Sequence, residues 1–267
     1  MSSSPEALPP VSRTAVGVAG LRAVESGRPD RLFEDPYAGA FFQAGQALFP
    51  AEARGGGLGR VFAEQVAIRT RFFDEFLEGA DQVVLLAAGL DARAFRLDWP
   101  EGARVFELDL PEVLEFKDAV LAARSARPRC ERVVVPVDLR EDWPTALRES
   151  GFAPERPTAW LAEGLLVYLD HDEAARLLTD VTALSAPGSR ISFEHRSEDD
   201  ELLRRARAVP NSADVTGLWK GGLGRTAPEW LTEHGWRPET HSRTELAAGY
   251  GRPSEETTSG GFLVGTR

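Results

Sequence analysis

Short apolar runs alternate with longer amphipathic stretches along most of this chain. The first run, VVLL at residues 83–86, lies between a charged segment and a glycine turn. Runs of this kind are typical of strands buried in a parallel sheet. The pattern therefore predicts an α/β fold with a doubly wound, mostly parallel sheet. Its strands are expected at residues 83–86, 104–110, 131–137, 157–168 (the fourth strand with its exit), 189–193, 237–240 and 262–264.

The amphipathic stretches predict the helices. Asp170 and Glu173 have the spacing of a capping box, which marks the start of one of them. Residues 1–10 lack an apolar period and end in two prolines, so we expect a mobile arm there. The helices are expected at residues 14–25, 37–42, 58–77, from Pro111 onward, 172–185 and 198–207.

Helix 58–77 carries an arginine on its apolar face. Projected at about 100° per residue, its apolar side chains form one stripe; Arg69 falls near the centre of that stripe and Arg71 on the opposite side. Burying a guanidinium without an anion is costly. Arg69 therefore needs a carboxylate, supplied either by the chain itself or by a bound ligand, whereas Arg71 is expected in solvent or in a surface ion pair.

The strongest chemical signal lies in residues 82–109. A buried strand is followed by a tight turn, Ala87 to Asp91, and the next strand ends in Glu107 and Asp109. Doubly wound folds hold an adenosine in this way, with the backbone of the turn close to the ligand and the acid on the ribose hydroxyls. A plain strand–helix–strand unit without a nucleotide is the alternative.

The turn also discriminates between nucleotides. The G-x-G-x-x-G spacing of a dinucleotide site is absent, which disfavours a nicotinamide dehydrogenase. Asp91 at the helix start would repel a pyrophosphate but tolerates a cationic or zwitterionic ligand. S-adenosylmethionine, with its sulfonium and zwitterionic tail, fits this requirement.

The blocks LLAAGLDARAFRLDWP and VFELDLPEVLEFK resemble those of the leucine carboxyl methyltransferase family, which belongs to the class I S-adenosylmethionine-dependent methyltransferases. The likeness extends through RAVESGRPDRLFEDPYA, IRTRFFD, VDLR, AEGLLVYL and a late PGS. One departure is Ala87, where the family usually carries glycine. The resemblance implies a Rossmann-like sheet closed by an antiparallel C-terminal strand. It also implies a single domain, in which residues 11–57 form a helical cap over the cofactor and residues 58–267 the core.

The resemblance also implies cofactor contacts beyond those of Ala87, Gly89 and Asp109. Arg69 would bind the cofactor carboxylate, and Arg22 is a candidate for a cofactor or substrate carboxylate. Asp138 and Leu139 would bind the adenine end, and Glu163 would lie near the sulfonium. The alternatives are that Arg22 pairs with Glu25 or Glu34, that Asp138 caps the next helix, and that Glu163 is a structural acid.

Methyl transfer is an in-line displacement at the sulfonium carbon, so a carboxylate acceptor needs no base and a hydroxyl acceptor does. The candidate catalytic residues are Glu163, Tyr168 and His195. His195, just past a predicted strand, is the histidine best placed as a general base, although a surface or capping role is the alternative. Tyr168 is expected on the substrate side, or else in the core. Histidine, cysteine and acidic residues lack metal-ligand spacing, so we expect no metal.

Composition limits the possible partners. The 267 residues are 42% hydrophobic and carry a net charge of −11, which argues against nucleic acid as a partner. The single cysteine, Cys130, fits a reducing compartment. Since no long apolar run or signal pattern is present, we expect a cytoplasmic protein without membrane contact, monomeric or homodimeric.

The sequence therefore predicts an S-adenosylmethionine-dependent O-methyltransferase that releases S-adenosylhomocysteine. Its acceptor is expected to be a carboxylate or hydroxyl of a small molecule, such as a polyketide-like natural-product intermediate. Two alternatives are a methyltransferase for protein or peptide C-terminal carboxyl groups and a non-catalytic module that binds the cofactor.

Overall fold

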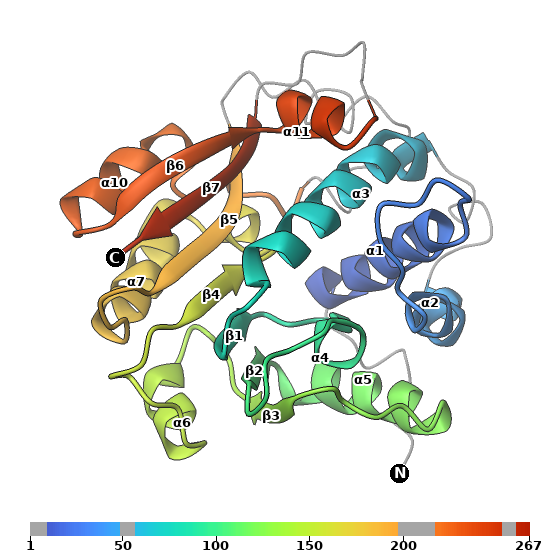
Figure 1. Cartoon of the computed structure of the whole chain (residues 1–267), viewed down its shortest axis with the longest axis horizontal. Helices are drawn as coiled ribbons and strands as arrows, with labels where there is room; N and C mark the ends of the chain where they lie inside the picture. The colour runs from blue at the N-terminus through green and yellow to red at the C-terminus, as the bar shows by residue number, and fades with distance from the viewer. Residues whose placement is uncertain (1–9, 49–56, 197–216, 253–259) are drawn as a thin grey trace.

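A central sheet with helices on both faces forms the body of the protein (Figure 1). The structure is a computed structural model that describes residues 10–48, 57–196, 217–252 and 260–267. The expected helix 198–207 and all but the last residue of the expected arm lie outside these ranges. Within them, the strand order is β3-β2-β1-β4-β5-β7-β6 in one seven-stranded sheet.

The sheet is parallel except at its C-terminal side, where β7 runs antiparallel to both β5 and β6. This confirms the predicted mostly parallel sheet with an antiparallel C-terminal strand. The strands are β1 (Gln82–Leu86), β2 (Arg104–Asp109), β3 (Glu131–Pro136), β4 (Ala159–Ala162), β5 (Arg190–Arg196), β6 (Arg237–Ser242) and β7 (Gly260–Thr266).

Alternate residues of the strands point into two separate cores. Val83 and Leu85 of β1 pack toward the face covered by α1, α3 and α5, whereas Val84 and Leu86 pack toward α6, α7 and α10. The helices are α1 (Pro10–Ser26), α2 (Ala38–Gly45), α3 (Gly57–Leu77), α4 (Arg93–Arg96), α5 (Pro111–Ala123), α6 (Trp143–Glu149), α7 (His171–Ala183), α10 (Ala227–Glu233) and α11 (Arg243–Gly249). Short 3₁₀ turns lie between these elements: η2 (Gln46–Leu48), η4 (Leu166–Tyr168) and η5 (Gly224–Thr226).

The sequence patterns explain how these helices begin and which faces they bury. Asp170 and Glu173 form the predicted capping box at the start of α7. On α3 the predicted stripe is buried, with Ile68 at 1% and Phe73 at 0% exposure. The stripe places α3 against the sheet and directs Arg69 toward the carboxyl ends of the strands.

Several predicted boundaries differ from those of the structure, and the differences at Pro10 and His195 matter most. Pro10, expected in the mobile arm, is the first residue of α1. A proline is tolerated there because the first amide of a helix has no hydrogen-bond partner within the helix. His195, expected just past a strand, lies inside β5 and pairs with Gly261 of β7. The antiparallel partner extends β5 beyond the point where its apolar residues end.

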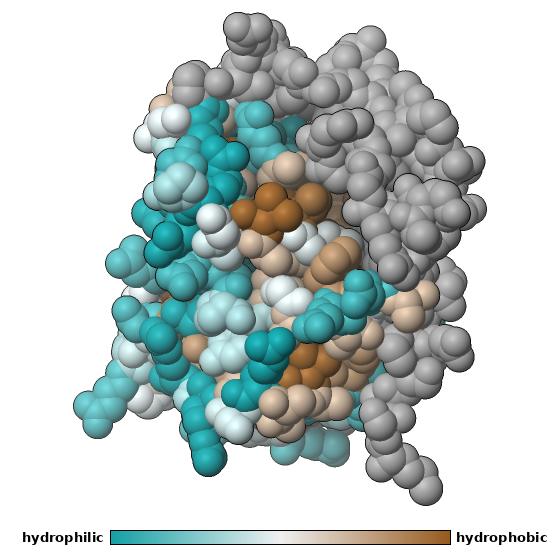
Figure 2. All heavy atoms as spheres, turned by 90° about the vertical axis from the view of Figure 1, so that its right-hand side faces the viewer, coloured by the Kyte–Doolittle hydropathy of each residue, from teal (hydrophilic) through white to brown (hydrophobic). Residues whose placement is uncertain are grey.

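Figure 2 shows the side of the molecule on which α1 and α2 lie, where polar side chains gather at the left of the view and apolar side chains near its middle. Among the described residues, Val24 is an exposed large apolar side chain, at 66%. A single exposed apolar side chain needs no partner. In the described part of the chain, none of the helices has the length and hydropathy needed to cross a bilayer.

Candidate active site

The carboxyl edge of the sheet brings together the turn after β1 and the acid at the end of β2. The Gly89 amide donates to Asp109 Oδ2 at 2.6 Å, and the Leu110 amide donates to Asp109 Oδ1 at 2.7 Å. Gly89 has a φ of +49°, which glycine adopts without a steric penalty. The structure therefore joins Gly89 and Asp109, while their contact with a nucleoside stays a prediction.

Ala87 lies two residues earlier in the same turn. Its φ of +55° is in the left-handed region, which costs a residue with a Cβ roughly 1–2 kcal/mol. This is the position where the resembled family usually carries glycine. The departure that the sequence showed is thus a point of backbone strain as well as an added methyl group.

The two acids of β2 have different environments. Burial raises the pKa of the Asp109 carboxyl, and its two backbone hydrogen bonds oppose that effect. Glu107 instead lies in the core, with its Oε2 2.7 Å from Lys117 Nζ and 2.7 Å from Arg132 Nη2. The charge of Glu107 is therefore balanced by Lys117 and Arg132 inside the protein. Of the two acids of β2, Asp109 is the one that lies at the carboxyl edge of the sheet.

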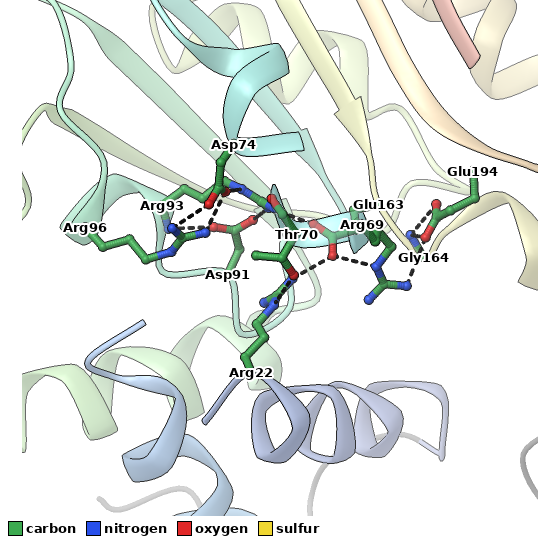
Figure 3. A network of polar contacts seen from close by, with 10 residues as sticks. All are labelled: Arg22, Arg69, Thr70, Asp74, Asp91, Arg93, Arg96, Glu163, Gly164 and Glu194. Carbon is green, nitrogen blue, oxygen red and sulfur yellow. Dashed lines mark hydrogen bonds and ion pairs between the residues drawn. The ribbon is translucent and has the colours of Figure 1, made fainter. Parts of the chain in front are cut away.

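Glu163 lies just past the end of β4 and forms ion pairs with three arginines (Figure 3). Its Oε1 is 2.6 Å from Arg22 Nη2 of α1 and 2.9 Å from Arg69 Nε of α3. Its Oε2 is 2.7 Å from Arg93 Nη1 of α4. Burial alone would raise the pKa of the Glu163 carboxyl, but the charges of Arg22, Arg93 and Arg69 outweigh it and hold the pKa well below its usual range.

Arg93 connects most of this network and is 1% exposed. Besides Glu163, its guanidinium binds Asp74 of α3 at 2.7 Å and Asp91 of the turn, and it donates to the Thr70 carbonyl at 3.4 Å. One side chain therefore holds α3, the turn after β1 and the end of β4 together. The sequence alone predicted no role for Arg93.

Arg69 pairs with two carboxylates of the chain itself. Besides Glu163, its Nη1 is 2.9 Å from Glu194 Oε1, at the carboxyl end of β5. Binding of Arg69 to a cofactor carboxylate stays a prediction. Arg71, in contrast, pairs with Glu75 at 2.8 Å and is 44% exposed, as predicted.

Arg22 pairs with Glu163, and its Nε donates to the Thr70 hydroxyl at 3.3 Å. The alternatives were wrong, because Glu25 pairs with Arg28 and Arg252 and Glu34 pairs with Arg31. A helix from the N-terminal segment therefore reaches the edge of the sheet.

The network is electrically balanced. It consists of four arginines and four carboxylates, each within ion-pair distance of at least one partner (Figure 3). A buried cluster with equal numbers of both charges suits a ligand end that carries one charge of each sign more than a net anion. The members are Arg22, Arg69, Arg93, Arg96, Asp74, Asp91, Glu163 and Glu194.

Asp138 and Leu139 lie in the turn after β3. Asp138 Oδ1 accepts from the Arg140 amide at 2.9 Å, and the hydrogen bonds from Arg140 lower the pKa of the Asp138 carboxyl. The alternative that Asp138 caps α6 is wrong, because Asp142 Oδ1 accepts from Thr145 N at the start of that helix. Contact of Asp138 and Leu139 with an adenine stays a prediction.

Tyr168 lies on η4 and His195 on β5. The Tyr168 hydroxyl donates to Thr14 Oγ1 of α1 at 3.3 Å, so η4 contacts the N-terminal helix. His195 follows Glu194 on β5. Burial lowers the pKa of its imidazole, and its buried Nδ1 has no hydrogen-bond partner among the described residues. A neutral ring with a free nitrogen is able to accept a proton.

A sequence profile described as leucine carboxyl methyltransferase matches residues 15–182, which hold every member of the network except Glu194. The chain belongs to the leucine carboxyl methyltransferase family. Two relatives carry the name of an S-adenosyl-L-methionine-dependent methyltransferase. One, from Parafrankia sp. (strain EAN1pec), is 50% identical over 96% of this chain and 87% of its own. The other, from Frankia alni (strain DSM 45986 / CECT 9034 / ACN14a), is 51% identical over 96% and 94%. The protein is thus an S-adenosylmethionine-dependent methyltransferase.

Solved structures of other proteins share the fold of this protein. A DUF574 family protein from Streptomyces avermitilis aligns with a TM-score of 0.57 at 16% identity, over 93% of this chain and 96% of its own. Magnesium protoporphyrin IX methyltransferase from Synechocystis, solved with bound S-adenosylhomocysteine, aligns with a TM-score of 0.50 at 11% identity, over 83% and 91%. The class I methyltransferase fold is therefore confirmed.

The residues at the edge fit the cofactor of the family. Asp109 can accept hydrogen bonds from ribose hydroxyls, and the turn at Gly89 brings the backbone close to Asp109. The balanced network matches the zwitterionic amino-acid tail of the cofactor. In the part of the chain that the structure describes, no group of three or more histidine, cysteine or acidic residues could hold a metal ion. Metal-independent transfer stays a prediction.

Neither Glu194 nor the role of Arg93 was predicted from the sequence. The signal for Glu194 was present, because an acid directly after a predicted parallel strand lies at the same edge as Glu163. The signal for Arg93 was weaker, since its partners Asp74 and Thr70 lie on a helix about twenty residues earlier.

Proposed function

We propose that this methyltransferase transfers the methyl group to an oxygen atom of a small molecule, a hydroxyl or a carboxylate of the polyketide-like, natural-product type. The observation that carries a hydroxyl acceptor is His195 near the end of β5: burial keeps its imidazole neutral at neutral pH by lowering its pKa, and its Nδ1 has no hydrogen-bond partner among the described residues, so the ring is available to take up a proton. A carboxylate acceptor agrees with the description of the family and needs no base.

When bound, S-adenosylmethionine supplies a methyl group activated on a sulfonium. Asp109 would bind its ribose and Asp138 with Leu139 its adenine. The tail would lie at Arg69 and Arg22, with Glu163 near the sulfonium. Because its pKa is held low, Glu163 is a poor proton acceptor. We therefore propose that it provides a negative charge and orients the arginines around it, rather than acting as a general base. Tyr168 would line the acceptor side.

The test is turnover with S-adenosylmethionine against two panels, small phenols with small carboxylic acids and peptides with a free C-terminus. Release of S-adenosylhomocysteine is measured. Turnover only with small molecules supports the proposal, and a pH–rate profile that loses its low-pH limb in His195→Gln would assign the base. Turnover only with peptides contradicts it.

Carboxyl methylation of a protein or peptide C-terminus is the second candidate, because the family takes its name from a leucine carboxyl group. Tight binding of S-adenosylhomocysteine without turnover of either panel would instead favour a non-catalytic module. We also propose that the protein acts in the cytoplasm as a monomer or homodimer, without nucleic-acid or membrane partners, on the basis of its net charge of −11 and its single cysteine. Light scattering after size exclusion measures the oligomeric state.

A further inference from the structure

Glu194 forms a second link between Arg69 and the turn at Gly164, beside the one that Glu163 makes from the preceding position (Figure 3). Its Oε1 is 2.9 Å from Arg69 Nη1. Both of its carboxylate oxygens are 2.9 Å from the Gly164 amide. The side chain is 10% exposed, so these contacts are largely shielded from water.

The turn at Gly164 is held from its other side as well. Gly164 has a φ of +64° and leads into η4, where the Val167 carbonyl accepts from the Lys220 amide at 2.8 Å. The far end of this link is therefore the Gly164 amide, in a turn whose following residues are hydrogen-bonded to a second segment. A guanidinium tied to such a point has less freedom than one bound only to a side chain.

We propose that Glu194 is a positioning residue, whose carboxylate ties Arg69 to the turn at Gly164 and so orients the guanidinium that receives the cofactor's carboxylate. This inference rests on the proposed contact between Arg69 and the amino-acid tail. It assigns Glu194 no contact with the reacting atoms.

Two ligands separate positioning from general support of the fold. S-adenosylhomocysteine carries the amino-acid tail, whereas 5′-methylthioadenosine has the same adenosine without it. Glu194→Gln keeps an oxygen for the Gly164 amide but replaces the charged bond to Arg69 by a neutral one. We expect the dissociation constant to rise about fivefold or more for S-adenosylhomocysteine and less than about twofold for 5′-methylthioadenosine, as charged hydrogen bonds are roughly twice as strong as neutral ones.

A double-mutant cycle places the effect on Arg69. In an Arg69→Leu background, Glu194→Gln should change neither dissociation constant by more than about twofold, since the group it orients is gone. Glu239→Gln is the matched control, because Glu239 lies on β6 and is 73% exposed. It should change neither constant. Calorimetry gives the constants, and the midpoint of thermal unfolding shows that each variant is folded.

The possible results are distinct. Equal weakening of both ligands in Glu194→Gln, an unchanged or tighter complex with S-adenosylhomocysteine, or an effect that persists without Arg69 would each overturn the positioning role. Failure of the unchanged protein to bind either ligand would overturn the proposed cofactor site itself. If Glu194→Gln does not fold, Glu194→Asp takes its place; it keeps the charge with a shorter reach and should weaken S-adenosylhomocysteine alone.

Discussion

The Gly89 amide donates to the Asp109 carboxylate at 2.6 Å, which joins the turn after β1 to the acid at the end of β2. The Leu110 amide donates to the other carboxylate oxygen. A carboxylate has about four lone-pair sites, so each oxygen retains capacity for another donor. The backbone thus fixes the orientation of Asp109 and leaves it able to bind a ribose diol.

Asp109→Ala should raise the dissociation constant for S-adenosylhomocysteine at least tenfold. Two lost ribose hydrogen bonds, at roughly 1 kcal/mol each, account for a change of this size. Titration calorimetry measures it. Asp98→Ala, at a side chain that is 98% exposed, is the control for loss of an aspartate. An unchanged constant in Asp109→Ala would contradict the assignment of the ribose.

Ala87→Gly should leave the free energy of unfolding unchanged or raise it by up to about 1.5 kcal/mol. Release of the left-handed strain gains roughly 1–2 kcal/mol, and the greater freedom of glycine in the unfolded chain costs about 0.5–1 kcal/mol. Urea unfolding measures the difference. A loss of more than about 1 kcal/mol would show that the Ala87 methyl group stabilises the turn.

Arg93→Met should lower the free energy of unfolding by about 3–5 kcal/mol. The substitution leaves Asp74, Asp91 and Glu163 without their shared buried cation. Arg71→Met on the exposed side of α3 should cost about 1 kcal/mol or less. Similar losses for the two variants in urea unfolding would argue against Arg93 as the centre of the network.

The stability contributed by ionised Glu163 should depend on pH. Its pKa is lowered in the folded protein, so this stability is fully present above the unfolded value near 4.5 and is lost as the pH falls toward the folded value. The wild type should therefore exceed Glu163→Gln most at neutral pH, and the difference should shrink below about pH 4.5. Urea unfolding of both proteins at a series of pH values gives the difference. A difference that stays constant or grows on acidification would contradict the lowered pKa.

The sequence predicted those features that depend on neighbouring residues in the chain. The apolar runs located the parallel strands, and the stripe on α3 identified Arg69 as a buried cation because both follow from local periodicity. The capping box at Asp170 was predictable for the same reason.

Features that depend on distant partners were not predictable. Arg22 meets Glu163 across 141 residues, so nothing near Arg22 distinguished that partner from Glu25 or Glu34. The extent of β5 past His195 depends on pairing with β7 at the end of the chain. Cap formation by Asp142 rather than Asp138 depended on where α6 begins, and helix boundaries are weakly encoded.

The central claim is that S-adenosylmethionine lies across the carboxyl edge of the sheet, between Asp109 and Arg69. A crystal structure of the complex with S-adenosylhomocysteine tests it most directly. We predict both ribose hydroxyls within about 3.2 Å of the Asp109 carboxylate and the tail carboxylate within the same distance of the Arg69 guanidinium. A nucleoside bound elsewhere, or an edge filled by protein side chains with Asp109 and Arg69 away from the ligand, would contradict it.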